Sequence, residues 1–326
     1  MRIYLLISLV FSSVLNSFSS GNHSLKMPDY AEKINQIVFR LSCDANDRQA
    51  AKKLLKTYSS ALMDYQKEIG RLRVKPDSFK WSKTYDLMDE FNQLSNEILY
   101  NSAASRVICE PRFYHDGLPE AKQKAVQELY NAGIHSLQLG TKRKAKEAYS
   151  CFVKADQLSP AFNDVSQKIR EAKNRATVNV VIDKVVAYAD KKSLFSIRFY
   201  QTLINKLQSR FLNDQFVNIY SFTDSKQRKI DPAAWYVRIS FIDFEMGELL
   251  TFDNTKSINV NGVAEIQIFS PDENKDILST RIPSQYVWKS YQDTGSFDLQ
   301  SIFDSFSMSM TDEVDDLLCD FIKQYN

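Results

Sequence analysis

Glycine is scarce in this sequence, with 8 glycines among 326 residues. A phosphate-binding loop needs glycines where the backbone approaches the phosphate closely, and neither a P-loop nor a dinucleotide-binding fingerprint occurs. An excess of one charge is also lacking, because 42 Lys and Arg residues nearly balance 40 Asp and Glu residues, for a net charge of +2. The chain as a whole has no field that would attract nucleic acid, so we predict no nucleic-acid partner.

Histidine and cysteine are too few and too scattered to suggest a metal site. The three histidines form no HExxH motif and have no metal-ligand spacing: His23, His115 and His135. The four cysteines include no CxxC pair: Cys43, Cys109, Cys151 and Cys319. We predict no metal and no cofactor. Buried free thiols are expected, with a disulfide between Cys43 and Cys109 as the alternative in an exported protein.

Catalytic motifs are also lacking, and no G-x-S-x-G nucleophile elbow occurs. Asp243, Glu245 and Glu248 lie near the end of a predicted strand, where two carboxylates on one face would suit acid–base chemistry. Exposed carboxylates at a strand end are the commoner arrangement. We therefore predict that the protein is not an enzyme, and a carbohydrate-active hydrolase using Asp243 or Glu245 is the weakest alternative.

The longest apolar run lies at the N-terminus. Arg2 precedes an apolar stretch from Ile3 to Leu15, and Ser17 and Ser19 then supply small residues for positions −3 and −1 of a cleavage site. The stretch is too short to span a bilayer, and the first cysteine lies too far along the chain for a lipoprotein-type anchor. These features predict a signal peptide over residues 1–20 and a periplasmic or secreted protein.

Residues 21–175 are predicted to form a helical domain. One helix carries an apolar stripe at intervals of three and four residues: Ala51, Leu55, Tyr58, Leu62 and Tyr65. The next helix is expected to begin with Asp77 or Ser78 as its N-cap. The segment from Pro119 to Lys173 predicts three helices, separated by turns at Gly140 and at Ser159-Pro160.

Part of this segment resembles a tetratricopeptide repeat. The resemblance depends on intervals of four, three and five residues between Ala148, Phe152, Ala155 and Pro160, with Gly133 and Gly140 similar to the glycines of the repeat's first helix and turn. Gly133 lies three residues too far from Ala148, and the aromatic residue at the start of the repeat's first helix is missing. The resemblance implies protein–protein binding in a concave groove.

A basic cluster lies at the turn within this repeat-like segment: Lys142, Arg143, Lys144 and Lys146. A solvated helix start would explain the cluster, and so would a docking patch for an acidic partner. The predicted groove assigns partner contacts to five residues: Tyr130, Lys142, Arg143, Lys146 and Tyr149.

Residues 176–326 are predicted to form a mixed domain in the order β-α-β-β-β-β-α. Dense β-branched residues from Val178 to Val186 predict a buried strand, and clean alternation from Trp235 to Phe241 predicts another. Thr311 is expected to cap a final helix, with the acidic residues after it in the first turn, where the helix dipole favours negative charge. The predicted fold class is α+β in two domains, with a mixed sheet and its helices on one face.

This second half resembles the small α/β domain of several bacterial envelope proteins. The resemblance is carried by the strand Val178–Ile182 with its following helix, and by the strand from Trp235 to Phe241 leading into Asp243 and Gly247. Examples are the N-terminal domain of TolB, the curli-secretion lipoproteins and the outer-membrane activators of penicillin-binding proteins. The resemblance implies a bacterial source with two membranes.

Together these patterns predict an exported, non-catalytic protein-binding or scaffold protein of the bacterial cell envelope, with a protein partner on the helical groove. In the alternative, the α/β domain forms a homo-oligomer or contacts the cell wall, and the helices are a structural adaptor. Proximity to a membrane surface without a lipid anchor is compatible with both.

Overall fold

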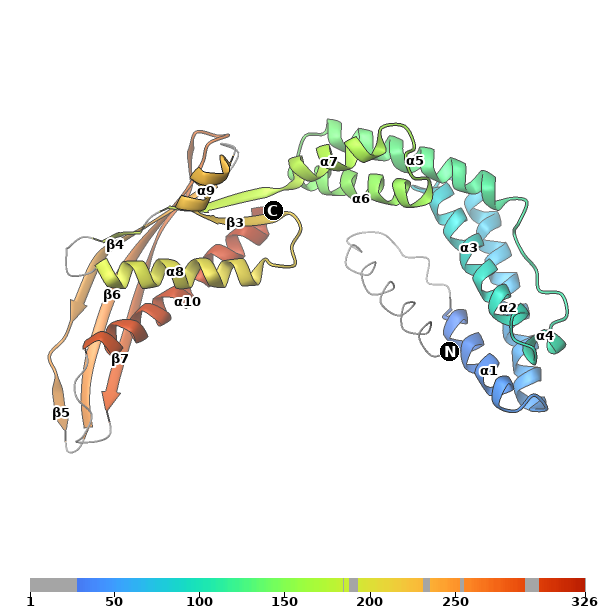
Figure 1. The fold of residues 1–326 in the computed structure, drawn as a ribbon, viewed down its shortest axis with the longest axis horizontal. Coiled ribbons are helices and arrows are strands. Elements are labelled where there is room, and N and C mark those ends of the chain that lie inside the picture. Colours follow the sequence, from blue (N-terminus) through green and yellow to red (C-terminus); the bar gives the residue numbers. More distant parts are fainter. Residues whose placement is uncertain are drawn as a thin grey trace. The chain divides into compact units, whose positions relative to one another are not determined.

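The chain folds into two compact units, seen in a computed structural model that describes residues 28–183, 185–187, 193–230, 235–252, 255–290 and 299–325 (Figure 1). Unit 1 comprises Met1–Asn131 and Lys154–Asn163, and unit 2 comprises Ala132–Val153 and Asp164–Asn326. The α+β class predicted from the sequence is confirmed. The candidate signal peptide lies outside the described residues, and the domain limits at 21–175 and 176–326 stay a prediction.

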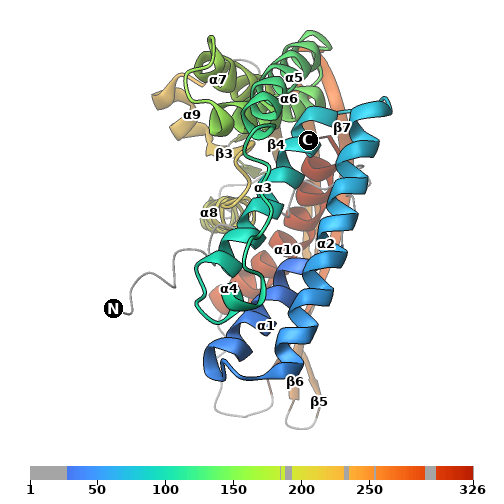
Figure 2. The same ribbon diagram turned by 90° about the vertical axis from the view of Figure 1, so that its right-hand side faces the viewer.

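The described part of unit 1 is helical, with α1 (Tyr30–Cys43), α2 (Arg48–Val74), α3 (Lys80–Leu99), the short α4 (Ala104–Val107) and the start of α5 (Leu118–Gln138). In Figures 1 and 2, α2 and α3 run side by side. The buried stripe of α2 consists of Ala50, Leu54, Tyr58, Ala61, Tyr65, Ile69 and Leu72. The predicted stripe was wrong at Leu55, which is 49% exposed, because neighbouring Leu54 occupies the core.

The start of α3 is capped in an unexpected way. Phe79 precedes the helix in the left-handed conformation, with φ of 57°, and provides no side-chain cap. Instead, a carboxylate oxygen of Glu128 on α5 accepts the backbone N–H groups of Trp81 and Ser82, both at 3.0 Å. Asp77, one of the predicted caps, forms an ion pair with Lys83 at 2.5 Å. The helix end is therefore satisfied by a distant residue, and the predicted caps are wrong.

The helical hairpin predicted around Gly140 is confirmed by α5, α6 (Lys142–Leu158) and α7 (Val165–Ala176). Gly140 takes a positive φ of 73°, which suits glycine at a helix end. At Gly133 a Cβ atom would lie 2.6 Å from the ring of Phe152, so the glycine lets α5 and α6 approach closely. Ala148 and Phe152 are fully buried at this crossing.

Unit 2 is built around one mixed sheet. Its strands are β1 (Val178–Ile182), β2 (Val186–Ala187), β3 (Val217–Ser221), β4 (Trp235–Met246), β5 (Leu250–Phe252), β6 (Thr255–Ser270) and β7 (Lys275–Ser290). The order is β3-β1-β4-β6-β5, with β2 beside β4 and β7 beside β6. β1 is parallel to β3 and β4, whereas the pairs that involve β6 are antiparallel. Among the described strands, β3 pairs only with β1 and so forms an edge of the sheet.

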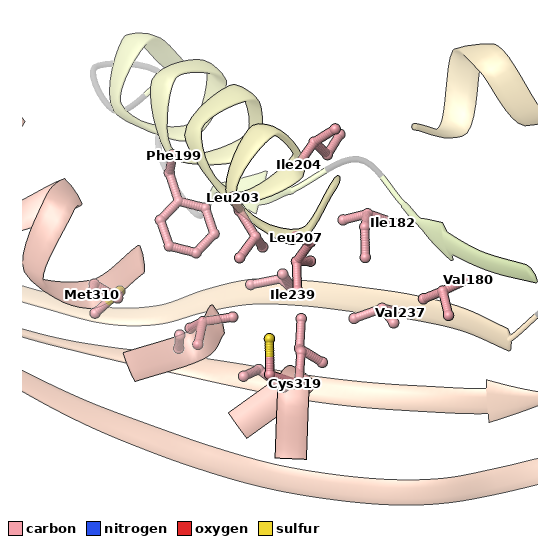
Figure 3. Packing of buried hydrophobic residues seen from close by; sticks show 14 of the residues in the cluster. Val180, Ile182, Phe199, Leu203, Ile204, Leu207, Val237, Ile239, Met310 and Cys319 are labelled. Atoms are coloured by element: carbon pink, nitrogen blue, oxygen red, sulfur yellow. The ribbon is translucent and has the colours of Figure 1, made fainter. Parts of the chain in front are cut away.

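Two long helices, α8 (Ser193–Arg210) and α10 (Leu299–Tyr325), cover one face of this sheet, and the short α9 (Phe222–Arg228) follows β3 (Figure 1). Figure 3 shows how Phe199, Leu203 and Leu207 of α8 meet Val237 and Ile239 of β4. On β6, Gly262 leaves room for α10, because a Cβ atom there would lie 2.7 Å from the ring of Phe306. The alternation of apolar residues along β4 thus fixes which face the helices cover.

The last helix begins earlier than predicted. Thr311 is not its N-cap but a fully buried residue inside α10, where its hydroxyl donates to the carbonyl of Ser307 at 2.6 Å. The acidic residues after Thr311 therefore do not lie in a first turn. Glu313 instead accepts the hydroxyl of Ser284 on β7. Asp312 and Asp316 face α8, where they pair with Lys206 and Arg210. Asp304, earlier in α10, pairs with Arg198 and completes a ladder of ion pairs. Each pair spans 106 positions, so α8 and α10 run parallel.

Candidate binding cleft at the edge of the sheet

A cleft of about 1030 Å³ lies in unit 2 along the edge strand β3. One wall is formed by β3 and the end of α8, and the other by the end of α7, the first residues of β1 and Lys142 at the start of α6. The lining residues are Lys142, Lys173, Asn174, Arg175, Thr177, Asn179, Gln208, Phe211, Leu212, Asp214, Gln215, Val217, Asn218, Ile219, Tyr220 and Arg228. Polar and apolar side chains both line the space, and the described edge of β3 borders it.

The backbone of β3 has a defined orientation in this cleft. The N–H of Val178 on β1 donates to the carbonyl of Phe216 at 2.7 Å, and alternate residues of β3 continue this pairing. The backbone groups of Val217, Ile219 and Ser221 therefore point to the free edge. The side-chain amide of Gln208 donates to the carbonyl of Ile219 at 3.2 Å, which is the geometry of an outward-facing carbonyl.

Carboxamide side chains follow the same edge. Asn218 of β3 donates to the side-chain oxygen of Asn179 on β1 at 3.0 Å. Gln208, Gln215 and Asn174 also line the cleft. Each carboxamide carries both a donor and an acceptor, as a peptide group does, so these side chains suit a ligand with an exposed backbone.

The charge in the cleft is mainly positive. Four basic residues line it, Lys142, Lys173, Arg175 and Arg228, against one acidic residue, Asp214. Burial lowers the pKa of Lys142, while the negative charge of nearby Asp272 acts to raise it. The ammonium group of Lys142 donates to the carbonyl of Thr177 at 3.4 Å. Such a wall favours a ligand that carries negative charge.

Two of the five predicted partner-binding residues contact the start of β3. The ring of Tyr149 packs edge-on against Phe216 at 5.3 Å, and the ammonium group of Lys146 lies 5.3 Å from the same ring. Burial also lowers the pKa of Lys146. Both side chains are thus engaged within unit 2, which leaves them little free surface for a partner.

The other three predicted residues are spread over different surroundings. Lys142 lines the cleft, whereas the side chain of Arg143 is 82% exposed and lies 3.9 Å from Glu147. Tyr130 belongs to unit 1, where its ring packs against Phe162 at 5.6 Å. Within unit 2, Lys142 lines the cleft, and Lys146 and Tyr149 contact Phe216 just before β3. The assignment of all five residues to a partner site stays a prediction.

Sequence patterns missed most of the cleft. Its basic wall includes Lys173 and Arg175, which were not predicted to contact a partner. Asn179 and Asn218 each interrupt a run of apolar strand residues, and this interruption is a signal that marks the uncovered face of a strand. The sequence does not say which strand lies at the sheet edge, so the signal alone would not have located the cleft.

The candidate catalytic and metal-binding residues form no comparable site. Asp243, Glu245 and Glu248 are exposed near the end of β4 and line neither this cleft nor a smaller pocket of about 450 Å³ between α8 and α10. Among the described residues, no group of three or more His, Cys, Asp or Glu side chains is placed to hold a metal ion. No described helix is long and apolar enough to cross a membrane.

The cysteines differ from the expectation of buried thiols at two of four positions. The described residues contain no disulfide, so the alternative of a Cys43–Cys109 bridge is not formed. Both of these side chains are exposed, while Cys319 is buried and Cys151 is half-buried. Cys43 ends α1 and Cys109 follows α4, and each lies on the outer surface of unit 1 because the core-facing positions beside them are Leu41 and Ile108.

The site is thus a mainly basic cleft beside an edge strand of an α+β protein, and comparisons with known proteins add little to it. No known protein family and no curated protein matches the sequence. A solved structure of a neuraminyllactose-binding hemagglutinin homologue from Helicobacter pylori matches with 15% identity, 46% of this chain, 87% of that chain and a TM-score of 0.35.

Two bacterial lipoproteins also match in structure. The minor lipoprotein from Acinetobacter baumannii has 12% identity, covers 44% of this chain and 89% of its own, and has a TM-score of 0.24. Lipoprotein GNA1162 from Neisseria meningitidis has 6% identity, 42% and 97% coverage, and a TM-score of 0.24. These neighbours are bacterial proteins of low similarity, and the tetratricopeptide and TolB-type resemblances stay predictions.

Proposed function

We propose that the protein is an exported, non-catalytic binding protein of the bacterial cell envelope, and that its protein partner docks in the cleft beside β3. The observation that carries this proposal is the cleft itself, which combines an unpaired strand edge, carboxamide side chains and a mainly basic wall. Its volume is at the upper end for small-molecule pockets, which are about 300–1,000 Å³. The location in the envelope is supported by the signal-like sequence at the N-terminus.

The proposed docking surface differs from the helical groove expected from the repeat-like spacing. Lys146 and Tyr149 both contact the ring of Phe216. A substitution such as Tyr149→Asp would therefore disturb this packing as well as any partner binding, and it would not test binding alone. Lys142 keeps a place in the proposal because it lines the cleft. In this proposal the helices present one wall of the cleft, and a scaffold role follows if unit 1 holds a second partner.

A chemical crosslinking pull-down from the native envelope fraction tests the proposal, with the chain lacking residues 1–20 as bait. The double variant Lys173→Glu/Arg175→Glu reverses two cleft charges, and Arg143→Glu reverses a nearby exposed charge outside the cleft. We expect one protein partner to be lost with the double variant and retained with Arg143→Glu. If the double variant retains the partner and Arg143→Glu loses it, the docking site lies on the helical surface and not in the cleft.

A second candidate function is self-association through the sheet edge at β5. This three-residue strand carries exposed apolar side chains, with Leu250 58% and Phe252 80% exposed, and Met246 and Leu249 are exposed beside it. Light scattering on the chain lacking residues 1–20 separates this candidate from the first. A monomer over a wide concentration range would remove it, whereas a dimer that Phe252→Ser dissociates would support it.

A further inference from the structure

We propose that the cleft accepts an acidic protein segment in extended conformation, which adds to the sheet as a strand along the free edge of β3. This inference rests on the proposed function, since it specifies the chemistry of the partner in the same cleft. It depends on three separate properties of the described residues: backbone orientation, side-chain amides and charge.

The backbone supplies the pairing groups. Val217, Ile219 and Ser221 direct their N–H and C=O groups away from β1. The N–H of Val217 already donates to the carbonyl of Asp214 at 3.4 Å, so a peptide laid along β3 would continue the hydrogen-bond ladder mainly at Ile219 and Ser221. Gln208 already occupies the carbonyl of Ile219 with a side-chain N–H at 3.2 Å, and an incoming peptide N–H would replace it. The strand is five residues long, which limits the paired segment to a similar length.

The side chains suit the flanks of such a strand. Asn179 and Asn218 lie on the face of the sheet opposite the core, joined at 3.0 Å, while Gln215 and Asn174 line the same cleft. Leu212 is 80% exposed at the cleft and offers an apolar contact for alternate side chains of the segment. Carboxamides beside a strand edge bind a peptide backbone without requiring one particular sequence.

The basic residues of the cleft favour a partner segment that is acidic. Lys173, Arg175 and Arg228 are exposed on the walls, while Lys142 is half-buried and has Asp272 nearby. Asp214 is the one acidic residue that lines the cleft. Arg175 also contacts Glu171 at 2.8 Å, so part of its charge is already balanced. The remaining excess favours carboxylates on the partner. A second copy of this chain is disfavoured as the occupant, because pairing two β3 edges would bring two basic walls together.

A peptide selection tests this inference on the chain lacking residues 1–20. A random heptapeptide library displayed on phage is selected on the immobilised protein, and enriched peptides are synthesised for fluorescence anisotropy. We expect enrichment of Asp and Glu and a loss of affinity on the order of tenfold with Lys173→Glu/Arg175→Glu. The control Lys289→Glu, an exposed position on β7, should leave the affinity unchanged.

Backbone N-methylation of the best peptide then separates strand pairing from charge alone. Because alternate amides of a strand face opposite edges, methyl groups on one set should abolish binding, and those on the other set should have little effect. Equal effects of both sets would overturn strand pairing. Enrichment of no peptide or of basic peptides, or equal binding of single-stranded oligothymidylate, would overturn the assignment to an acidic protein segment.

The two proposals fail in different ways. If the envelope partner is lost with Lys173→Glu/Arg175→Glu but N-methylation has no directional effect, the cleft remains the docking site and only the strand mode is wrong. If the double variant retains its envelope partner, the proposed function fails, whatever the peptides show.

Discussion

The cores of the two units handle polar groups differently. In unit 1, hydroxyls and amides tie the segment after α4 to the helices: the Tyr58 hydroxyl accepts the N–H of Arg112 at 2.7 Å and lies 3.1 Å from the Ser95 hydroxyl, which donates to the carbonyl of Arg112 at 2.6 Å. In unit 2, the core between α8, the sheet and α10 is mainly apolar, and a buried hydroxyl such as that of Thr311 bonds within its own helix. Three ion pairs that join α8 to α10 lie at the rim of this core.

This difference in polar bonding follows from the secondary structure that surrounds each core. A helical core leaves irregular segments lying against buried helix faces, and their backbone groups need partners. A sheet satisfies its own backbone groups through the ladder, so its core admits apolar side chains up to the edges. A comparable pair of bonds in unit 2 lies where α8 meets strand ends, at Tyr200, whose hydroxyl donates to the carbonyl of Ile182 and accepts the N–H of Phe222, both at 3.0 Å.

The largest expected effect tests whether the two cores are independent. Phe91 in unit 1 and Phe199 in unit 2 are both fully buried, so each change to Ala should lower the free energy of unfolding by about 3–5 kcal/mol. Phe91 packs against Tyr65 and Phe199 against Phe241, with ring centroids 5.3 and 5.0 Å apart. Hydrogen exchange should show lost protection only in the unit that carries the change.

The paired variants are each other's controls. If Phe91→Ala exposes the amides of β4 and β6 as much as those of α2 and α3, the cores unfold as one and the comparison between them loses its basis.

The next effect isolates the polar network of unit 1. Tyr58→Phe removes a hydroxyl that serves the N–H of Arg112 and the hydroxyl of Ser95, at a site only 6% exposed. We expect a loss of about 1–2 kcal/mol in the free energy of unfolding, because the partly buried N–H of Arg112 and the buried hydroxyl of Ser95 would both lose a partner. Denaturant titration measures it.

Tyr200→Phe is the matched control in unit 2, since it also removes one donor and one acceptor. Tyr200 is half-buried, so water replaces part of the lost bonding and the expected loss is smaller. A larger loss at Tyr200 than at Tyr58 would contradict the contrast between a polar and an apolar core.

Much of the fold was predictable because periodicity reports burial directly. Alternation from Trp235 to Phe241 predicted the core face of β4, and the predicted order β-α-β-β-β-β-α corresponds to β1, α8, β3, β4, β6, β7 and α10. The short elements β2, α9 and β5 were not predicted as separate elements, because two to seven residues give too little periodicity. Helix ends were harder to predict. Glu128 caps α3 from 46 residues away in the chain, and α10 begins twelve residues before Thr311, with its start at Leu299. Neither feature has a local signal.

The candidate cleft was less predictable, for a topological reason. The basic cluster near Lys142 was visible in the sequence, but its surroundings depend on β3 lying at the sheet edge beside the end of α7. Phe216 contacts Lys146 and Tyr149, two of the residues predicted to bind a partner, and no local pattern in the sequence indicates this contact. Strand order is set by contacts distant in sequence, and those contacts decide which polar residues meet.

Asp315 is a fully buried carboxylic acid in the mainly apolar core of unit 2, and it gives a test by pH. Its side chain is fully buried beside Arg210 at 2.7 Å, and the thiol of Cys319 lies 3.7 Å away. Burial raises its pKa above the ordinary 3.8; Arg210 and Lys206 oppose this rise, and Asp316 adds to it. Because the raised pKa means that the folded state holds the proton more tightly, this group favours folding below about pH 4 and loses that contribution as pH rises through its folded pKa.

Asp315→Asn removes this titration while Arg210 keeps Asp316 as a partner. We expect the variant to gain stability relative to the wild type between acidic and neutral pH, measured as the difference in unfolding midpoint across a pH series. If the difference in unfolding midpoint stays constant, or shrinks as the pH rises, then the charged form of Asp315 does not destabilise the folded state.

The smallest expected effect concerns the ion pairs between α8 and α10 at the rim of the core of unit 2. Lys206 and Asp312 belong to a ladder whose constant offset holds α8 parallel to α10, whereas Lys154 and Asp86 form a lone exposed pair in unit 1 at 2.6 Å. A double-mutant cycle to Ala at each pair should give a coupling of about 0.2–1 kcal/mol that falls at about 1 M salt. The ladder pair should couple at least as strongly, because its neighbours hold both helices in register and less side-chain entropy is lost in pairing. A ladder coupling of zero beside a measurable one in unit 1 would mean that apolar packing alone sets the helix register.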